Sequence, residues 1–525
     1  MNKSAEATVQ AFYLGLDYGT GGAKAAVIDG DARLAGYAFE EYAILTSADR
    51  PGWSEHDAAA YWPVACRLIN KACAQADISP AQIQAVASSS ALPSLVLVDA
   101  EGRPIRNGIN LMDRRATAEV QFLKDTIGED RVFEVTKNRL DDHPAIVNLL
   151  WIRENRPEEF ARSRWALTID GYLTLRLTGM ATCHYSAAAF YGVAYDLLHR
   201  RLDQAMLDEI GIPARLFPPL FYCTDIVGRV TPQAAADTGL RPGVPVAAGQ
   251  VDCNAGWVGA GALADGDMQM NLGTCGNFGI IHTQPTFHRS MIAFNYTTDT
   301  ADRPVFITVP TTTTGGGLIR YLRDTIYAAE RAAEAQSGAD VYDLINDEAA
   351  AVPAGSDGLI VLPFLMGERT PIWDVHARGV IFGLSLNHTR GHIARASMEA
   401  VAYALYDSFA LIRQTGQKIN TPFVLNEGGA KSRLWRRIIT DVFNTPTVLV
   451  SSRAGAPYGD ALLAGVATGA FPSFDVARRH VEHVEPMTPD ARAHERYMRS
   501  FALYKRLYEH VKDDYRALAQ LRENR

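Results

Sequence analysis

The stretch Leu16-Asp17-Tyr18-Gly19-Thr20-Gly21-Gly22-Ala23-Lys24 decides the fold of this chain. An apolar run at residues 13–16 precedes its glycines and another at residues 23–28 follows them, so the stretch predicts a β-hairpin. Glycines let backbone N–H groups approach a bulky anion, and a carboxylate beside phosphates usually serves a hydrated Mg²⁺. Asp17 is therefore a candidate metal residue, although an ordinary glycine-rich hairpin turn would use the same residues.

The same pattern returns further along the chain. Two mainly apolar runs, at residues 267–272 and 277–281, flank Gly273-Thr274-Cys275-Gly276 and predict a second hairpin with Gly-Thr in its turn. The repetition suggests an internal duplication, although glycine turns are common in hairpins. Two such turns, one from each of two domains, would clamp a triphosphate.

Strands and helices are expected to alternate after residue 300, which is typical of an α/β domain. The expected strands lie near residues 305–309, 358–362, 424–426 and 447–449, and the expected helices near residues 317–334, 393–414, 434–444 and 460–468. A chain of 525 residues is too long for one ordinary core. We place the boundary near residue 250, which gives domains over residues 1–250 and 251–525.

The composition of the chain limits the kinds of partner that we expect it to bind and the cellular compartment in which we expect it. The chain is 47% hydrophobic and 21% charged, and its net charge of −8 is spread along the sequence, so no nucleic-acid partner is expected. The polar segment Met1–Gln10 does not resemble a signal peptide, and no apolar run is long enough to predict a membrane span. Six scattered cysteines without a Cys-x-x-Cys pair fit a reducing compartment, so we expect a cytoplasmic protein.

Two further sites are open to more than one interpretation. Asp252 follows an apolar strand and precedes a helix of small residues. It is suited to cap that helix, or to act as the general base that phosphoryl transfer to a hydroxyl requires. Gly428-Gly429-Ala430-Lys431-Ser432 lies between a strand and a helix, where it would contact a nucleotide or only allow close packing.

Several other chemistries are disfavoured. The Walker pattern Gly-x4-Gly-Lys-Ser/Thr is absent, and no Gly-x-Gly-x-x-Gly opens a helix after a strand. His388 and His392 have the spacing of zinc ligands, but Thr389 stands where a zinc protease has glutamate, so we expect a solvated loop there.

Taken together, these features resemble the FGGY family of carbohydrate kinases across nearly the whole chain. The residues that carry the resemblance are Leu16–Lys24, Gly52-Trp53-Ser54-Glu55-His56-Asp57, Ile169-Asp170-Gly171-Tyr172-Leu173, Gly367-Glu368-Arg369-Thr370-Pro371, Gly379–Leu384 with Ala396–Glu399, Gly428–Ser432, and Tyr458-Gly459-Asp460-Ala461-Leu462-Leu463-Ala464-Gly465. The resemblance implies an α/β fold of two actin-like (ribonuclease H-like) domains with an ATP cleft between them. It places the sugar with the first domain and the nucleotide with the second.

The resemblance also implies roles for single residues. Asp252 matches the catalytic base and Asp17 the carboxylate associated with Mg²⁺. The residues that match ATP and phosphate contacts are Thr20, Gly21, Gly273, Thr274, Gly317, Gly428 and Gly429. ATP and Mg²⁺ are thus the expected cofactors, and a homodimer is the expected assembly.

The substrate loop departs from the family pattern. Xylulose kinases carry Gln-Met-His-Gly there and glycerol kinases an Arg-Glu pair, whereas this chain has Ser88-Ser89-Ser90-Ala91-Leu92-Pro93. Ser89, Ala91, Asp113 and Arg114 are the candidate sugar contacts, together with Asp252. His143 lies in a stretch that often lines the sugar pocket in this family, although we expect it at the surface. A pentulose such as xylulose or ribulose is the expected substrate. The alternatives are glycerol, erythritol, a quorum-signal dione, or a sugar sensor on the same fold that binds nucleotide without turnover.

Overall fold

The computed structural model describes residues 11–451 and 455–523, which divide into two α/β units. Unit 1 comprises the described residues of Met1–Leu263, Ala293–Phe306 and Ser452–Glu482. Unit 2 comprises those of Ala264–Ile292, Ile307–Ser451 and His483–Arg525. The chain therefore returns to unit 1 twice after residue 263, which two consecutive domains divided near residue 250 do not describe. The segment Met1–Gln10, on which the expectation of no signal peptide rests, lies outside the described residues.

The main sheet of unit 1 has the strand order β14-β15-β6-β1-β2-β3, with β16 also paired to β6. The predicted first hairpin is confirmed, because β1 (Phe12–Tyr18) runs antiparallel to β2 (Gly22–Asp29). On its other side β1 runs parallel to β6 (Ile83–Ser90). This register sets Asp17 opposite Lys24 on β2 and opposite Ser89 on β6.

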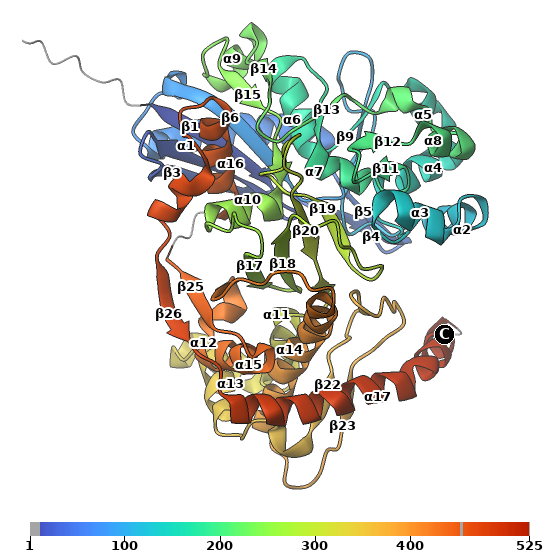
Figure 1. Cartoon of the computed structure of the whole chain (residues 1–525), viewed down its shortest axis with the longest axis vertical. Coiled ribbons are helices and arrows are strands. Elements are labelled where there is room, and N and C mark those ends of the chain that lie inside the picture. The colour runs from blue at the N-terminus through green and yellow to red at the C-terminus, as the bar shows by residue number, and fades with distance from the viewer. Residues whose placement is uncertain (1–10, 452–454, 524–525) are drawn as a thin grey trace, which may run out of the picture. The chain divides into compact units, whose positions relative to one another are not determined.

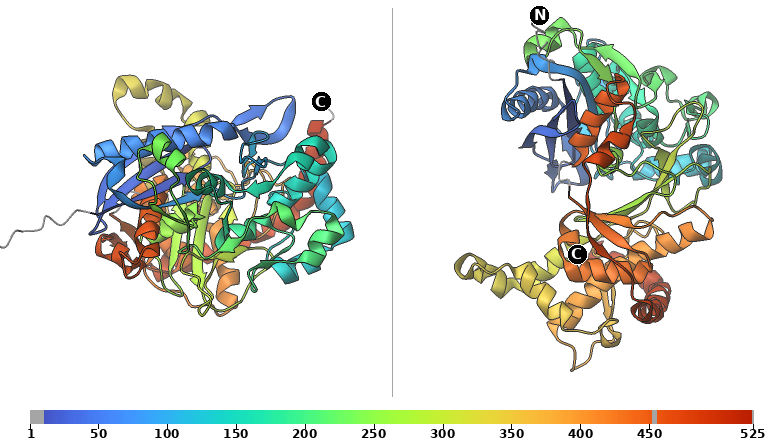
Figure 2. Two further views of the ribbon diagram at one scale, coloured as in Figure 1. Left: turned by 90° about the horizontal axis from the view of Figure 1, so that it is seen from above. Right: turned by 60° about the vertical axis from the view of Figure 1, so that its left-hand side comes forward.

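Helices cover both faces of this sheet because the strands are buried on both sides. The helix α1 (Tyr61–Gln75) packs on β2 and β3, and α16 (Gly455–Ala467) packs on β1 and β6 (Figure 1). Figure 2 shows the orange-red α16 beside the blue strands from a second direction. Gly15 leaves room for α16, since a Cβ there would lie 2.0 Å from the carbonyl oxygen of Pro457. The late return of the chain to unit 1 thus completes the sandwich around β1.

The remaining elements of unit 1 surround this sandwich. Its other strands are β3 (Leu34–Glu41), β4 (Leu45–Ser47), β5 (Arg50–His56), β7 (Val96–Val98), β8 (Gly108–Ile109), β9 (Trp165–Leu167), β10 (Cys183–His184), β11 (Tyr195–Asp196), β12 (Arg201–Leu202), β13 (Leu220–Phe221), β14 (Ile226–Arg229), β15 (Pro245–Ala247) and β16 (Gln250–Val251). Its other helices are α2 (Thr117–Thr126), α3 (Glu129–Thr136), α4 (Ala145–Asn155), α5 (Pro157–Arg162), α6 (Ile169–Thr178), α7 (Tyr185–Ala188), α8 (Gln204–Ile210), α9 (Pro232–Thr238) and α10 (Asp252–Gly259).

Unit 2 repeats the central arrangement of unit 1. The predicted second hairpin is confirmed as β17 (Met268–Leu272) and β18 (Gly276–His282), and β17 again has a parallel neighbour, β24 (Phe423–Asn426). The sheet order is β19-β20-β18-β17-β24-β25-β26, with β21 on β18. The other strands of unit 2 are β20 (Phe306–Val309), β21 (Thr311–Thr312), β22 (Ile360–Leu362), β23 (Val380–Phe382), β25 (Thr447–Val450) and β26 (His483–Met487), whereas β19 (Ile292–Asn295) is assigned to unit 1 from Ala293 onward. The helices are α11 (Gly316–Thr325), α12 (Ala328–Ser337), α13 (Val341–Ala350), α14 (Arg390–Gln414), α15 (Arg433–Phe443) and α17 (Ala491–Glu523).

Two local expectations in unit 2 are wrong. The helix expected over residues 317–334 is divided between α11 and α12 at Tyr327, which is fully buried and donates a hydrogen bond to Glu348 at 2.9 Å. His392 does not lie in a solvated loop but in the first turn of α14, where its Nδ1 accepts from the backbone N–H of Thr389 at 3.1 Å. Thr389 and His392 thus form the capping box of α14, which gives His392 a structural role at the start of this helix. Within the described residues, no helix has the length and apolar character needed to cross a membrane.

Candidate active site

The carboxyl ends of β1 and β6 bring Asp17 together with two polar neighbours. The Lys24 ammonium, on β2, donates to Asp17 Oδ2 at 2.9 Å, and the Ser89 hydroxyl lies 3.3 Å from Asp17 Oδ1. Asp17 is buried, so these partners offset the cost of holding its charge away from water. The next residues of the hairpin turn, Thr20 and Gly21, leave this buried edge, and a Cβ at Gly21 would meet nothing within 4 Å.

Asp252 begins α10 directly after β16, the strand that pairs with the end of β6. It does not cap the helix in the usual way, because Val251 is the N-cap residue and, within the part of the chain that the structure describes, the Asp252 carboxylate accepts only from the neighbouring Cys253 N–H, at 2.6 Å. Burial raises the pKa of Asp252 to about 7, and the negative charge of Asp17 adds to this shift, whereas Lys24 opposes it. A carboxylate poised near neutral pH can accept a proton from a substrate hydroxyl.

A second polar network, which the sequence reasoning missed, lies at the end of β6. His184 Nε2 is 3.0 Å from Asp170 Oδ2, and Ser90 at the end of β6 donates to the other oxygen of Asp170. Burial alone would lower the pKa of His184, but the charge and hydrogen bond of Asp170 raise it to about 10. Gly249 passes close to this pair with a φ of +105°, a conformation that glycine tolerates best. Asp170 belongs to the Ile169–Leu173 motif quoted above, whereas no sequence motif marks His184.

Two of the candidate sugar contacts, Ala91 and Asp113, are buried and already hydrogen-bonded within unit 1. Ala91 is buried and its N–H donates to the Tyr18 carbonyl at 2.8 Å. Asp113 is 2% exposed, and it accepts from the Ser54 N–H at 2.7 Å and pairs with the Arg115 guanidinium at 2.6 Å. Its carboxylate is therefore engaged in holding its own loop. Among the described residues, no hydrogen bond or ion pair joins Asp113 to Asp17 or Asp252.

Arg114 points to a different part of unit 1. Its guanidinium pairs with Asp142 at 2.7 Å and lies 2.6 Å from His143 Nδ1. The side chain of His143 is only 10% exposed, so the expectation of a surface histidine is wrong. The reason is that Asp141 Oδ1 and Asp142 Oδ1 each lie 3.0 Å from His143 Nδ1 and the Arg114 guanidinium lies beside the same nitrogen, which the sequence pattern does not reveal.

Three glycine-bearing segments of unit 2, all predicted as nucleotide contacts, meet beside β17. The N–H groups of Gly315 and Gly317 donate to the Thr274 carbonyl at 2.9 and 3.0 Å, and the N–H of Gly316 donates to the Gly273 carbonyl at 2.6 Å. A side chain would not fit at Gly429 either, since a Cβ there would lie 2.7 Å from Leu272 Cβ. The missing side chains therefore allow these backbone segments to pack within hydrogen-bonding distance of one another.

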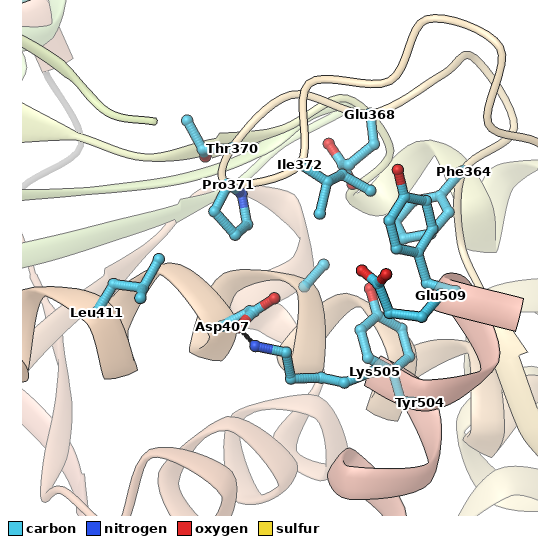
Figure 3. A pocket seen from close by; sticks show the side chains of 12 residues that line it. Phe364, Glu368, Thr370, Pro371, Ile372, Asp407, Leu411, Tyr504, Lys505 and Glu509 are labelled. Atoms are coloured by element: carbon cyan, nitrogen blue, oxygen red, sulfur yellow. Dashed lines mark hydrogen bonds and ion pairs between the residues drawn. The ribbon is translucent and has the colours of Figure 1, made fainter. Parts of the chain in front are cut away.

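Glu368 contacts the residues that come just before the Gly315–Gly317 segment. Its carboxylate accepts from the Thr312 hydroxyl and from the Thr313 N–H, the latter at 2.9 Å, and burial raises its pKa to about 7. Glu368 also borders a pocket that contains the Asp407–Lys505 ion pair, whose atoms lie 2.7 Å apart (Figure 3). No residue predicted from the sequence as a site residue lines this pocket.

Comparison with known proteins covers both units. The descriptions "FGGY family of carbohydrate kinases, N-terminal domain" and "C-terminal domain" match residues 12–259 and 268–468. The chain is 28% identical to the xylulose kinase of Bacillus subtilis (strain 168), over 98% of this chain and 100% of that protein. It is 29% identical to the autoinducer-2 kinase of Klebsiella pneumoniae, over 95% of this chain and 94% of that protein. The crystal structure of xylulose kinase from Rhodospirillum rubrum matches with a TM-score of 0.87 and 27% identity, over 96% of this chain and 100% of that structure.

Proposed function

Because the chain belongs to the FGGY family of carbohydrate kinases and is thus an ATP-dependent sugar phosphotransferase, we propose that its substrate is a pentulose such as xylulose or ribulose. Several of the similar proteins are xylulose kinases, and they match along almost the whole chain. The observation that carries the chemistry is the position of Asp252 at the start of α10, directly after the strand that pairs with the end of β6, where Ser89 contacts Asp17. The homodimer and the cytoplasmic location stay predictions.

The proposed reaction transfers the γ-phosphoryl group of ATP to one sugar hydroxyl. Asp252 takes the hydroxyl proton, the hydroxyl oxygen bonds to the γ-phosphorus, and the bond from that phosphorus to the bridging oxygen breaks to release ADP. Asp17 offers the oxygen ligands that Mg²⁺ prefers, and the ion would neutralise phosphate charge when bound. Because Lys24 already donates to Asp17 Oδ2, we propose that Asp17 would contact Mg²⁺ through the water molecules of the hydrated ion. In unit 2, the Gly273–Thr274, Gly315–Gly317 and Gly428–Gly429 segments would hold the nucleotide.

The pKa of Asp252 leads to a pH prediction. A base must be deprotonated to act, so kcat/KM measured with both substrates below their KM should rise with pH and bend near pH 7. In Lys24→Met the cation that lowers the pKa of Asp252 is absent, so the bend should move to higher pH. A profile that stays flat through neutral pH, or a shift to lower pH in the variant, would contradict the assignment.

The substrate is tested by ADP release over a panel of xylulose, ribulose, gluconate, glycerol, erythritol and a quorum-signal dione. We expect the highest kcat/KM with a pentulose, and Asp252→Asn provides the blank for background ATP hydrolysis. Preference for the dione is the specific alternative, because the Klebsiella pneumoniae relative is an autoinducer-2 kinase. Sugar binding by calorimetry without turnover of any compound would instead indicate a sensor.

A further inference from the structure

A second buried carboxyl group lies next to Asp17, and the reaction proposed above does not use it. Asp460 projects from α16 and is 0% exposed. Its Oδ2 lies 2.7 Å from the Ser89 hydroxyl, and its Oδ1 accepts from Gln250 Nε2 at 2.9 Å. Among the described residues no cation pairs with Asp460. A charged carboxylate in this position would lack a counter-ion.

The hydrogen bonds around Asp460 form a chain that runs from Gln250 at one end to Lys24 at the other. Gln250 Nε2 donates to Asp460 Oδ1 at 2.9 Å, and the Thr297 hydroxyl donates to Gln250 Oε1 at 2.6 Å. At the other end, Lys24 donates to Asp17, whose ionised carboxylate can only accept. The direction of the hydrogen bonds between these two ends therefore depends on the Ser89 hydroxyl, which lies between Asp460 and Asp17.

Ser89 has one hydroxyl hydrogen but two carboxyl neighbours, Asp460 Oδ2 at 2.7 Å and Asp17 Oδ1 at 3.3 Å. If both were ionised, one of them would face the hydroxyl without receiving its hydrogen. A proton on Asp460 Oδ2 resolves this, because Asp460 then donates to Ser89 and Ser89 donates to Asp17. The surroundings agree, since burial and the charges of Asp17 and Asp170 raise the pKa of Asp460 well above its usual value, although Ser89 and Gln250 oppose this.

We propose that Asp460 is a positioning residue whose neutral carboxyl group donates to Ser89 and accepts from Gln250, and so fixes both carboxylates of the kinase site. Through Ser89 it directs a hydrogen bond at Asp17 on β1. Through Gln250 it anchors β16, which leads directly into Asp252. The inference rests on the roles proposed above for Asp17 and Asp252.

The test compares Asp460→Asn with Asp460→Ala. Asparagine can donate from Nδ2 to Ser89 and accept at Oδ1 from Gln250, so we expect kcat to stay within about threefold of the parent, since one neutral hydrogen-bond pair replaces another. Alanine removes both contacts, and the resulting displacement should lower kcat by about 10- to 100-fold with little change in the KM for ATP. Thermal melting of both variants checks that they are folded.

Two further measurements separate positioning from mere packing. If Asp460 is neutral, Asp460→Asn should leave the rise of kcat/KM near the parent pH; if Asp460 were ionised, losing its charge would move the rise to lower pH. Asp460→Asn as impaired as Asp460→Ala, or such a shift, would overturn the proposal. If the alanine variant does not fold, Ser89→Ala takes its place, and an unchanged kcat there would overturn it. An active Asp252→Asn would instead refute the proposed base, independently of these outcomes.

Discussion

Replacing Asp252 by asparagine is expected to lower kcat by about 10²- to 10⁴-fold, the range that a positioned general base contributes. The amide has the shape of the carboxylate and can still accept from the Cys253 N–H, but it cannot take the hydroxyl proton. Nucleotide affinity should change little, because Asp252 is not among the predicted nucleotide contacts, most of which belong to unit 2. Single-turnover kinetics give the loss of rate, and calorimetry with ADP gives the affinity.

Asp203→Asn is the matched control for this substitution. Asp203 also lies at a helix start in unit 1, where it caps α8 by accepting from the Met206 N–H at 3.0 Å. Asparagine caps helices as well as aspartate does, so kcat and stability should stay near the parent values. Most of the activity surviving in Asp252→Asn would show that another group acts as the base.

The parts of the site that the sequence predicts are those with a local pattern. Apolar runs on each side of Gly-Thr turns predict both hairpins, and strand alternation places Asp17 at the end of β1. Asp252 is displayed in the same way, by a strand that leads into a helix of small residues. In each case the residues that determine the geometry lie within a few positions of one another.

The parts that the sequence does not predict depend on distant residues. Ser89 and Asp460 are 371 positions apart, and only the return of α16 to unit 1 brings them together. Asp113 shows the opposite problem, because an aspartate in the expected substrate region is paired with Arg115, two residues away. Residue type and position alone cannot distinguish a ligand contact from a buried ion pair, since burial decides which partners compete for the charge.

Adding one methyl group at Gly315 is expected to be the most damaging small change in unit 2. The Cβ of Gly315→Ala would lie 2.5 Å from the carbonyl carbon of Cys275 and 2.6 Å from the Gly276 nitrogen. These are backbone atoms that cannot rotate aside, so the Gly273–Thr274 turn or the start of α11 must move. Displacements of about 1 Å in a reacting site can cost about 10²-fold, and we expect a loss of that size in kcat/KM for ATP.

Gly30→Ala separates this local displacement from a general effect of alanine. Gly30 lies in the turn after β2, and its added Cβ would meet only the Ala11 carbonyl oxygen, at 3.8 Å, an ordinary contact. We expect parent-like kinetics for Gly30→Ala, and for Gly315→Ala a weaker ADP affinity by calorimetry in a protein that still melts cooperatively. Unchanged ADP affinity in Gly315→Ala would mean that the glycines beside β17 serve packing alone, because the displaced backbone would then make no contact with the nucleotide.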